Sequence, residues 1–453
     1  MVPETWHEAR LIPTSGIGSP IEQERRATSA LLAVIGAVDE FGKALLKTCG
    51  APSGRIETYV EVPFELGKKS LRPDGVIRVV RGKKVWTALV EVKTSVNTLE
   101  LEQVENYLDL AKENSYDAVI TISNEIPPVV GTHPLVLDKR KVKNVPIYHF
   151  SWVRIVSTAL MQKEVHGVED PDQAWILGEL IRYLEHQNSG ALAFTDMGAS
   201  WTKVREDARK GVLKKSDPDV LDVAAKFDAL VRYTCLRLGQ KLGTEVFPQL
   251  PRRQIQNPKE RTAELIDELI ADSCLSAKIR IPDTVADLDL RCDLRGQQIH
   301  VSVTVPASSH ARSETRERWL LRQLSEDLQD VVVEASGRGK KVAVPLNEAR
   351  SDEKSLAPDP EWEISKFKVT HIYPLGIARS TRVKSSFIDS VSNSVDDFYG
   401  RVLQRLKPWN PPAPKLRAQP EERKADDQYS STDLSSMDTS EPATPPADAL
   451  TES

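Results

Sequence analysis

The stretch LRPDGVIRVVRGKKVWTALVEVKTSVN, residues 71–97, decides the fold of the first part of the chain. Its two apolar runs flank Gly82 and Lys83, and a glycine at the first central position is typical of a two-residue type II′ turn. The pattern therefore predicts an antiparallel hairpin in which Arg81 lies opposite Lys84 and pairing continues outward residue by residue.

Three charged residues lie at the open end of this hairpin. The register places Asp74 opposite Glu91, and Lys93 points to the same face because it lies two residues further along the strand. Two opposed carboxylates repel each other unless a cation lies between them. The cluster is therefore either a structural group that Lys93 neutralises or a site for a hard divalent cation such as Mg²⁺, whose ligands are carboxylate, water and phosphate oxygens.

The segment before the hairpin has the pattern of a helix from Pro20 to about Lys47, with Ser19 as its N-cap. Glu24 lies on the same face as the apolar stripe of this helix. A carboxylate at that position can reach the edge of the core, where it would either join the charged cluster or pair with a buried arginine.

The segment after the hairpin is expected to form a second helix, roughly residues 98–113, with Asn97 and Glu100 as a capping box. Gln103 and Tyr107 are four residues apart, so they share one face of that helix. They form either a hydrogen bond on the helix surface or part of a functional site.

Further strands are expected at residues 56–64, 116–123 and 145–150. The resulting order is helix, three strands, helix and strand, with additional elements after it. This order predicts an α/β layer architecture.

Together these features resemble the PD-(D/E)XK nuclease superfamily, whose common core is the αβββαβ unit of the restriction endonuclease-like fold. The matching residues are Pro73-Asp74, Glu91-Val92-Lys93, the helical acid Glu24 and the Gln103-x-x-x-Tyr107 motif. The last motif is similar to that of the exonuclease-type QxxxY branch. The resemblance covers about residues 20–150.

The resemblance implies that Asp74 and Glu91 bind Mg²⁺ or Mn²⁺ and that Lys93 acts on the attacking water. It also implies that Glu24 supports the metal or a second one, and that Gln103 and Tyr107 position the substrate backbone or the lysine. The substrate would be nucleic acid, DNA rather than RNA. Candidate contacts to its phosphates are the nearby cations Arg25, Arg26 and Arg72.

Four regions are expected along the chain. Residues 1–163 would form the nuclease-like domain, 164–243 a helical connector and 244–408 a second α/β domain. Residues 409–453 are rich in proline, serine, threonine and acids, so they predict a disordered tail, either a solubilising segment or one that binds a protein partner.

The second α/β domain is either a degenerate, catalytically inactive repeat of the first or an unrelated accessory domain. If Gly296 and Gln297 form the hairpin turn, Asp289 lies opposite Thr304, and Ser302 and Thr304 replace the acid and the lysine. A basic helix follows, which is either a surface for phosphates or an ordinary solvated face; its arginines are Arg312, Arg316, Arg318 and Arg322.

Composition and the absence of other motifs exclude several classes of protein. The formal net charge of −5 is located after Trp409, where four basic residues stand against nine acidic ones. No apolar run predicts a membrane span, and the four dispersed cysteines indicate free thiols in a reducing cytoplasm. There is no P-loop, HExxH or GxSxG motif.

The sequence therefore predicts a metal-dependent nuclease of repair, recombination or defence. The alternative is a nuclease-like fold that no longer cuts and instead binds nucleic acid or acts as a scaffold. A third interpretation is an α/β interaction protein with a chance cluster of charges, which would require Asp74 and Glu91 to face different sides of the sheet.

Overall fold

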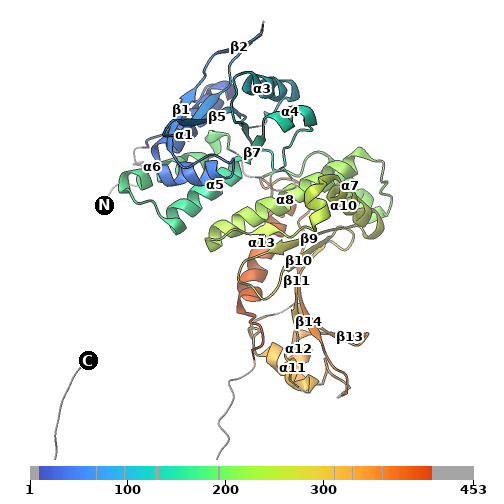
Figure 1. Ribbon diagram of the computed structural model, residues 1–453. Helices are drawn as coiled ribbons and strands as arrows, with labels where there is room; N and C mark the ends of the chain where they lie inside the picture. Colours follow the sequence, from blue (N-terminus) through green and yellow to red (C-terminus); the bar gives the residue numbers. More distant parts are fainter. Residues whose placement is uncertain are drawn as a thin grey trace, which may run out of the picture. The chain divides into compact units, whose positions relative to one another are not determined.

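The predicted hairpin forms the centre of a five-stranded sheet (Figure 1). β4 (Gly75–Arg81) and β5 (Lys84–Val92) pair antiparallel from Arg81 opposite Lys84 to Gly75 opposite Val90, so the predicted register is confirmed. Gly82 has a φ angle of 61°, as the first central position of a type II′ turn requires.

The structure is a computed structural model in which residues 10–67, 69–95, 97–127, 132–191, 194–310, 312–328, 330–352, 354–359 and 361–410 are described. The predicted tail lies outside the described residues from Pro411 onward. None of the described helices is long and apolar enough to cross a membrane. All four cysteines are free and buried, as expected of thiols that are not part of a disulfide framework.

The strand order in the first sheet is β1–β4–β5–β6–β7. β1 (Arg55–Val60) is antiparallel to β4, whereas β6 (Ala118–Ser123) is parallel to β5 and β7 (Ile147–Ser151) is parallel to β6. The carboxyl ends of three neighbouring strands therefore meet at one edge of the sheet. A short hairpin that was not predicted, β2 (Phe64–Leu66) with β3 (Lys69–Leu71), lies between β1 and β4 in the chain.

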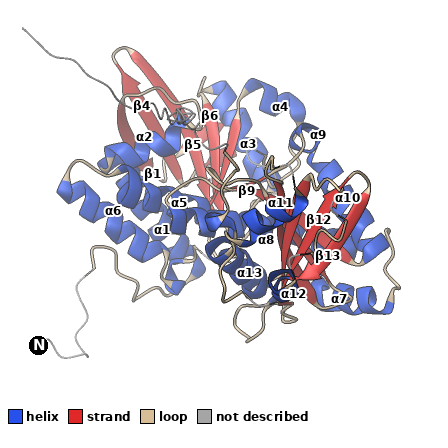
Figure 2. Cartoon of the chain, turned by 90° about the horizontal axis from the view of Figure 1, so that it is seen from below, coloured by secondary structure: helices blue, strands red, loops and turns tan. Residues whose placement is uncertain are grey.

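Helices cover both faces of this sheet (Figure 2). The even-numbered residues of β5, such as Val90, belong to the core formed with α1 (Pro20–Ala37) and α6 (Pro171–Leu184). Leu89 contacts the smaller core on the opposite face, which α3 (Leu101–Glu113) covers. Two further helices complete these layers, α2 (Asp39–Lys47) and α5 (Trp152–Met161) on the α1 side, with the short helix α4 (Lys139–Asn144) beside α3.

The N-terminal helix is interrupted, so the prediction of one continuous helix to about Lys47 was wrong. Val38 has extended backbone angles (φ −109°, ψ 97°) and separates α1 from α2. Gly42 makes this sharp crossing possible, because a Cβ there would overlap the carbonyl oxygen of Ile35. The break therefore results from how the two helices pack against each other. The hydrophobic periodicity of the segment alone does not predict it.

The start of α3 also differs from the prediction. The helix begins at Leu101, and its N-cap Glu100 makes no side-chain capping hydrogen bond. The free Leu99 amide instead donates to Glu125 Oε2 at 3.4 Å. A carboxylate from a distant loop thus replaces the local capping box.

A second, seven-stranded sheet has the order β13–β12–β14–β11–β10–β9–β8, and all its pairs are antiparallel. β14 separates β12 from β11, so this sheet does not repeat the order of the first. The strands are β8 (Phe247–Pro248), β9 (Cys274–Arg280), β10 (Leu288–Asp293), β11 (Gln298–Pro306), β12 (Val331–Gly337), β13 (Lys340–Pro345) and β14 (Lys366–Pro374).

The predicted pairing of the second hairpin was wrong by two residues, because its loop is longer than a two-residue turn. Asp289 lies opposite Ser302, not opposite Thr304. The facing is unchanged by a two-residue shift, so Asp289 still points to the same side of the sheet as Ser302.

The helices expected as a connector divide between the two cores. α6 packs into the core of the first sheet, whereas α7 (Ser200–Lys210) and α8 (Pro218–Leu242) pack into that of the second. The described chain to Asn410 belongs to one compact unit. The other helical segments are η1 (Gln162–His166), η2 (Gln187–Ser189), α9 (Arg252–Gln256), α10 (Pro258–Asp272), α11 (Ser313–Leu321), α12 (Leu346–Ser351), α13 (Phe387–Arg401) and η3 (Leu403–Arg405).

We expect Leu89→Ala to lower the free energy of unfolding by about 2–5 kcal/mol, because it leaves a cavity under α3 in a fully buried position. Leu101→Ala on α3 is the matched control, since Leu101 is 46% exposed and its truncation should cost less than about 0.5 kcal/mol. Urea denaturation of both variants measures the difference. Equal losses would contradict the assignment of Leu89 to a packed core.

Candidate active site

Asp74 lies directly before β4 and is fixed by the strand opposite it. Its Oδ2 accepts a hydrogen bond from the Val92 amide at 2.7 Å. Burial raises the pKa of the carboxyl, while this hydrogen bond and the charge of Lys93 act in the opposite direction. The side chain is therefore held at the end of the hairpin as the register predicts.

Glu91 is the most deeply buried acid of the cluster. It is 1% exposed and forms an ion pair with Lys93 through Oε1. Its Oε2 has no hydrogen-bond partner among the described residues. Burial and then the charge of Asp74 raise the pKa of Glu91 to about 8, against the effect of Lys93. An acceptor oxygen thus remains available for a cation.

Lys93 lies between two acids that come from different elements. Its Nζ contacts Glu91 and is 3.7 Å from Glu24 Oε1. Burial disfavours the ammonium charge, but Glu91, Glu24 and Asp74 outweigh burial and raise the pKa of Lys93. Its carbonyl oxygen accepts a hydrogen bond from Trp152 Nε1 at 2.8 Å, which fixes the backbone of the motif strand.

Glu24 reaches the cluster from α1, as predicted. It does not pair with a buried arginine: besides Lys93, its Oε2 accepts the Thr94 amide at 3.2 Å. In the part of the chain that the structure describes, no three Asp, Glu, His or Cys side chains are grouped closely enough to hold a metal ion. The site therefore offers Asp74 and Glu91 as its pair of opposed carboxylates, with Glu24 bound to the motif backbone.

Gln103 and Tyr107 interact as their spacing predicts. Gln103 Nε2 donates to the Tyr107 hydroxyl at 3.2 Å, and this hydroxyl donates to the Arg72 carbonyl at 3.3 Å. Burial, followed by the charge of Glu91, raises the pKa of Tyr107. The pair thus holds the backbone just before Asp74, and the Tyr107 hydroxyl also interacts with Glu91.

The three predicted phosphate contacts are already bonded to protein groups. Arg26 donates to the carbonyls of Pro13 and Ser15 at 2.9 Å each and pairs with Glu22, which indicates a structural role. Arg25 and Arg72 share the carboxylate of Glu61 at 2.8 and 2.7 Å; the two arginine side chains are 65% and 59% exposed. Only this exposed pair remains a candidate for contact with a polyanion.

The basic helix of the second half provides no uniform cationic face. Arg316 is buried, and its guanidinium donates to the carbonyls of His310 and Ile364. This arginine joins loop segments to the second core, so Arg316 lies on neither of the two surfaces considered for this helix, the phosphate-facing one or the solvated one.

A distant segment packs against the charged cluster, and no local sequence pattern predicts this contact. Gly190 accepts the Ser95 amide at 2.8 Å and the Asn124 side chain at 2.8 Å through its carbonyl. Gln23, the neighbour of Glu24, bonds the Ser95 hydroxyl and the Asn188 carbonyl. The segment after α6 thus binds the loop that follows Lys93.

A second unpredicted feature is a directed chain of hydrogen bonds beside Glu91. Thr121 pairs with Glu91 across β5 and β6, and His149 pairs with Thr121 across β6 and β7. The Thr121 hydroxyl lies 2.9 Å from both His133 Nε2 and His149 Nδ1. The other ring nitrogens contact the Leu135 amide at 3.1 Å and the Glu125 carbonyl at 2.9 Å.

Neutral rings and the two ends of this chain determine its direction. Burial lowers the pKa of His133 to about 4 and that of His149 to about 3, so both rings are neutral near pH 7. The Glu125 carbonyl can only accept, so His149 Nε2 carries the hydrogen and its Nδ1 is an acceptor for the Thr121 hydroxyl, which also lies 3.3 Å from the Tyr148 carbonyl. The Leu135 amide can only donate, so His133 accepts there and donates to Thr121 through Nε2.

Comparison with known proteins gave no relative: neither a protein family model nor a curated protein matches this chain.

Gly190→Ala should lower both stability and any activity of the cluster. The residue has a φ angle of 76°, and an added Cβ would lie 2.7 Å from Gln23 and 2.8 Å from Thr94. The substitution should cost about 1–3 kcal/mol of backbone strain and in addition displace the groups that hold Glu24. Gly167→Ala is the control, because Gly167 has a φ of 82° but open space around its Cβ position. Equal losses on chemical denaturation would contradict the proposed contact.

The histidine chain predicts a loss of stability in acid. Because burial lowers both histidine pKa values, the folded state binds fewer protons than the unfolded state below about pH 6.5. The free energy of unfolding should therefore fall as the pH drops from 6.5 to 4, by up to about 1.4 kcal/mol per pH unit for each histidine. His133→Gln should reduce this slope, whereas His166→Gln, at an exposed position, should not. An unchanged slope in the His133 variant would count against the neutral chain.

Proposed function

We propose that the chain is a metal-dependent nuclease that hydrolyses phosphodiester bonds of nucleic acid. The observation that carries the proposal is the convergence of Asp74, Glu91 and Lys93 on one spot, where a buried oxygen of Glu91 has no well-formed hydrogen bond to any of the described residues. The strand order β1–β4–β5–β6, with α1 and α3 on opposite faces, supports the resemblance to the PD-(D/E)XK superfamily.

The residues fit a hard divalent cation. Asp74 and Glu91 supply oxygen ligands of the kind that Mg²⁺ and Mn²⁺ prefer. Without a cation, burial and then the nearby charge of Asp74 raise the pKa of Glu91, because a buried carboxylate beside a second one is costly to charge. When bound, the metal would activate a water molecule and polarise the scissile phosphate.

Lys93 would act as an electrostatic group. Its raised pKa keeps the ammonium charged at neutral pH, so it can donate hydrogen bonds to the attacking water or to a phosphate oxygen but cannot remove a proton. Glu24 and Glu91 hold the ammonium between them. This fixed position allows Lys93 to stabilise the negative charge that develops on the phosphate.

The substrate would approach the exposed arginines beside this cluster. Phosphate groups of DNA would compete with Glu61 for Arg25 and Arg72, which are the exposed cations next to Asp74 and Glu24 in the sequence. This electrostatic contribution predicts binding that weakens as the salt concentration rises.

One observation favours a second candidate, a nucleic-acid-binding module that does not cut. No third acidic ligand joins Asp74 and Glu91 among the described residues, and Lys93 already neutralises part of their charge. A protein of this kind would bind DNA without divalent cations and would tolerate the loss of Asp74.

We expect the full-length chain to cut labelled single- or double-stranded DNA with Mg²⁺ or Mn²⁺ but not with a chelator. Asp74→Asn and Glu91→Gln should each lower the cutting rate by at least 100-fold, because each removes a carboxylate that holds the metal. Gel analysis of the products measures the rate and separates exonucleolytic from endonucleolytic cutting.

Stability measurements on the same variants separate a lost site from a lost fold. Because the pKa of Glu91 is raised, the contribution of this residue to wild-type stability decreases as the pH rises from about 4.5 toward 8, opposite in sign to the contribution of the two histidines. Glu91→Gln carries no charge, so it should be as stable as the wild type or more stable at pH 8. Loss of folding in both variants would favour a structural charge cluster, and metal-independent DNA binding without cutting would favour the second candidate.

A further inference from the structure

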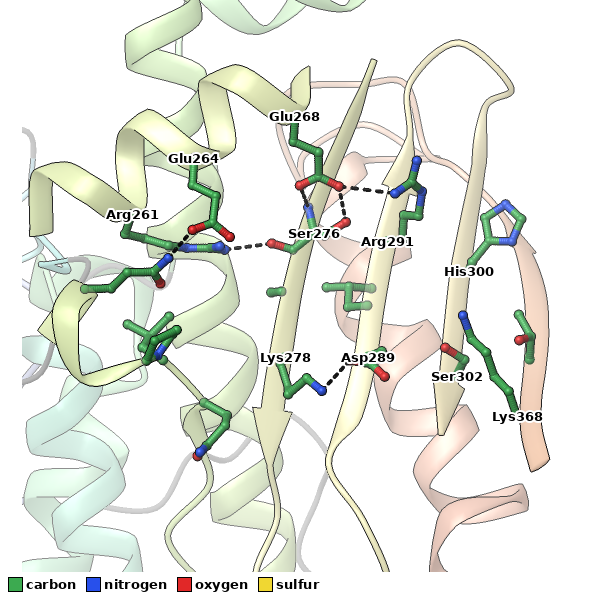
Figure 3. A pocket seen from close by; sticks show the side chains of 17 residues that line it. Arg261, Glu264, Glu268, Ser276, Lys278, Asp289, Arg291, His300, Ser302 and Lys368 are labelled. Carbon is green, nitrogen blue, oxygen red and sulfur yellow. Dashed lines mark hydrogen bonds and ion pairs between the residues drawn. The ribbon is translucent and has the colours of Figure 1, made fainter. Parts of the chain in front are cut away.

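A groove on the second sheet lies outside the proposed active site (Figure 3). Its volume is about 670 Å³, within the range of about 300–1,000 Å³ that is typical of small-molecule sites. The polar faces of β9, β10, β11 and β14 form the floor. Residues 249–254 and α10 form one wall.

Alternation along the strands separates this floor from the core. Val301 and Val303 of β11 are fully buried among apolar residues, whereas His300 and Ser302 point to the groove. Strand pairing sets one polar row across four strands, and this row consists of Lys278, Asp289, Ser302 and Thr370.

On the side of the groove next to α10, the charged side chains form ion pairs and hydrogen bonds with one another. Glu268 accepts the Ser276 amide at 3.1 Å and is 3.4 Å from Arg291. Lys278 lies 3.1 Å from Asp289. These groups maintain the shape of the groove, and their charges largely cancel.

The opposite side is unpaired. Among the described residues, the side chains of His300, Ser302, Lys368 and Thr370 form no hydrogen bond or ion pair. Glu334, the acid directly opposite Lys368 on β12, is 3.5 Å from Lys341 instead. An ammonium, an imidazole and two hydroxyls therefore remain available in a recess where Ser302 is only 4% exposed. This combination of donors fits a phosphate group.

The wall at residues 249–254 has a different character. Leu250 and Pro251 supply apolar surface. Gln254 is 1% exposed and donates to Glu264, so it lies behind this surface and holds the segment in place. The apolar wall suits the flat ring of a base.

We propose that this groove binds a nucleoside monophosphate, with the phosphate on His300, Ser302, Lys368 and Thr370 and the base against residues 249–254. The site uses none of the residues of the proposed active site. It therefore stands independently of the proposed nuclease function and would bind without a divalent cation.

Calorimetric titration of the full chain tests the proposal with three probes: a purine nucleoside monophosphate, its nucleoside and inorganic phosphate. The monophosphate should bind at least 10-fold more tightly than either fragment. Lys368→Ala should weaken it at least 10-fold. Thr370→Val should weaken it as well, and serves if the first variant fails to fold. Lys340→Ala is the control, because Lys340 is 63% exposed, pairs with Asp359 and lies outside the groove.

Asp74→Asn should bind the monophosphate as the wild type does, even if it no longer cuts DNA. The proposal is overturned if phosphate alone binds as tightly as the monophosphate, if Lys340→Ala and Lys368→Ala weaken binding equally, or if the monophosphate does not bind. None of these outcomes depends on whether the chain cuts nucleic acid.

Discussion

The forced opposition of Asp74 and Glu91 is the constraint on which the first half of the structure depends. Antiparallel pairing of β4 and β5 fixes where these residues lie, and the buried face of the sheet removes water from Glu91. One ammonium, that of Lys93, faces three carboxylates once Glu24 is included. Apolar groups would make a core at this position more stable, and this cost is consistent with the proposed function, which uses the local negative charge.

The sequence predicted this hairpin well because the information is local. A glycine turn sets the first pair, and each later pair follows from it, including the facing of Asp74 and Glu91. Glu24 and the Gln103–Tyr107 pair were also predictable, since helix periodicity decides which face they occupy. The contacts that complete the site come from Gly190 and the segment after α6, and no local pattern connects that glycine with Ser95.

The contacts of charged side chains were less predictable from the sequence than the burial of apolar side chains. A run of arginines in a sequence does not reveal whether each one meets solvent or a carbonyl group of a distant loop. Arg26 and Arg316 both bind backbone carbonyls, which satisfies otherwise exposed polar groups of irregular segments. The alternative in which the second sheet repeats the strand order of the first failed for a related reason. β14 lies between β11 and β12 in the sheet but follows both of them in the chain.

The two sheets differ in where they leave polar side chains, and the difference follows from strand direction. β5 and β6 are parallel, so a crossover is required, and its helix α3 covers the face that carries Glu91 and Thr121. The second sheet is wholly antiparallel, and its helices α11 and α13 contribute to the apolar core on one side. An antiparallel sheet can leave its other face open to solvent. The first sheet therefore places its polar cluster at the edge of a covered face, and the second leaves a groove across an open one.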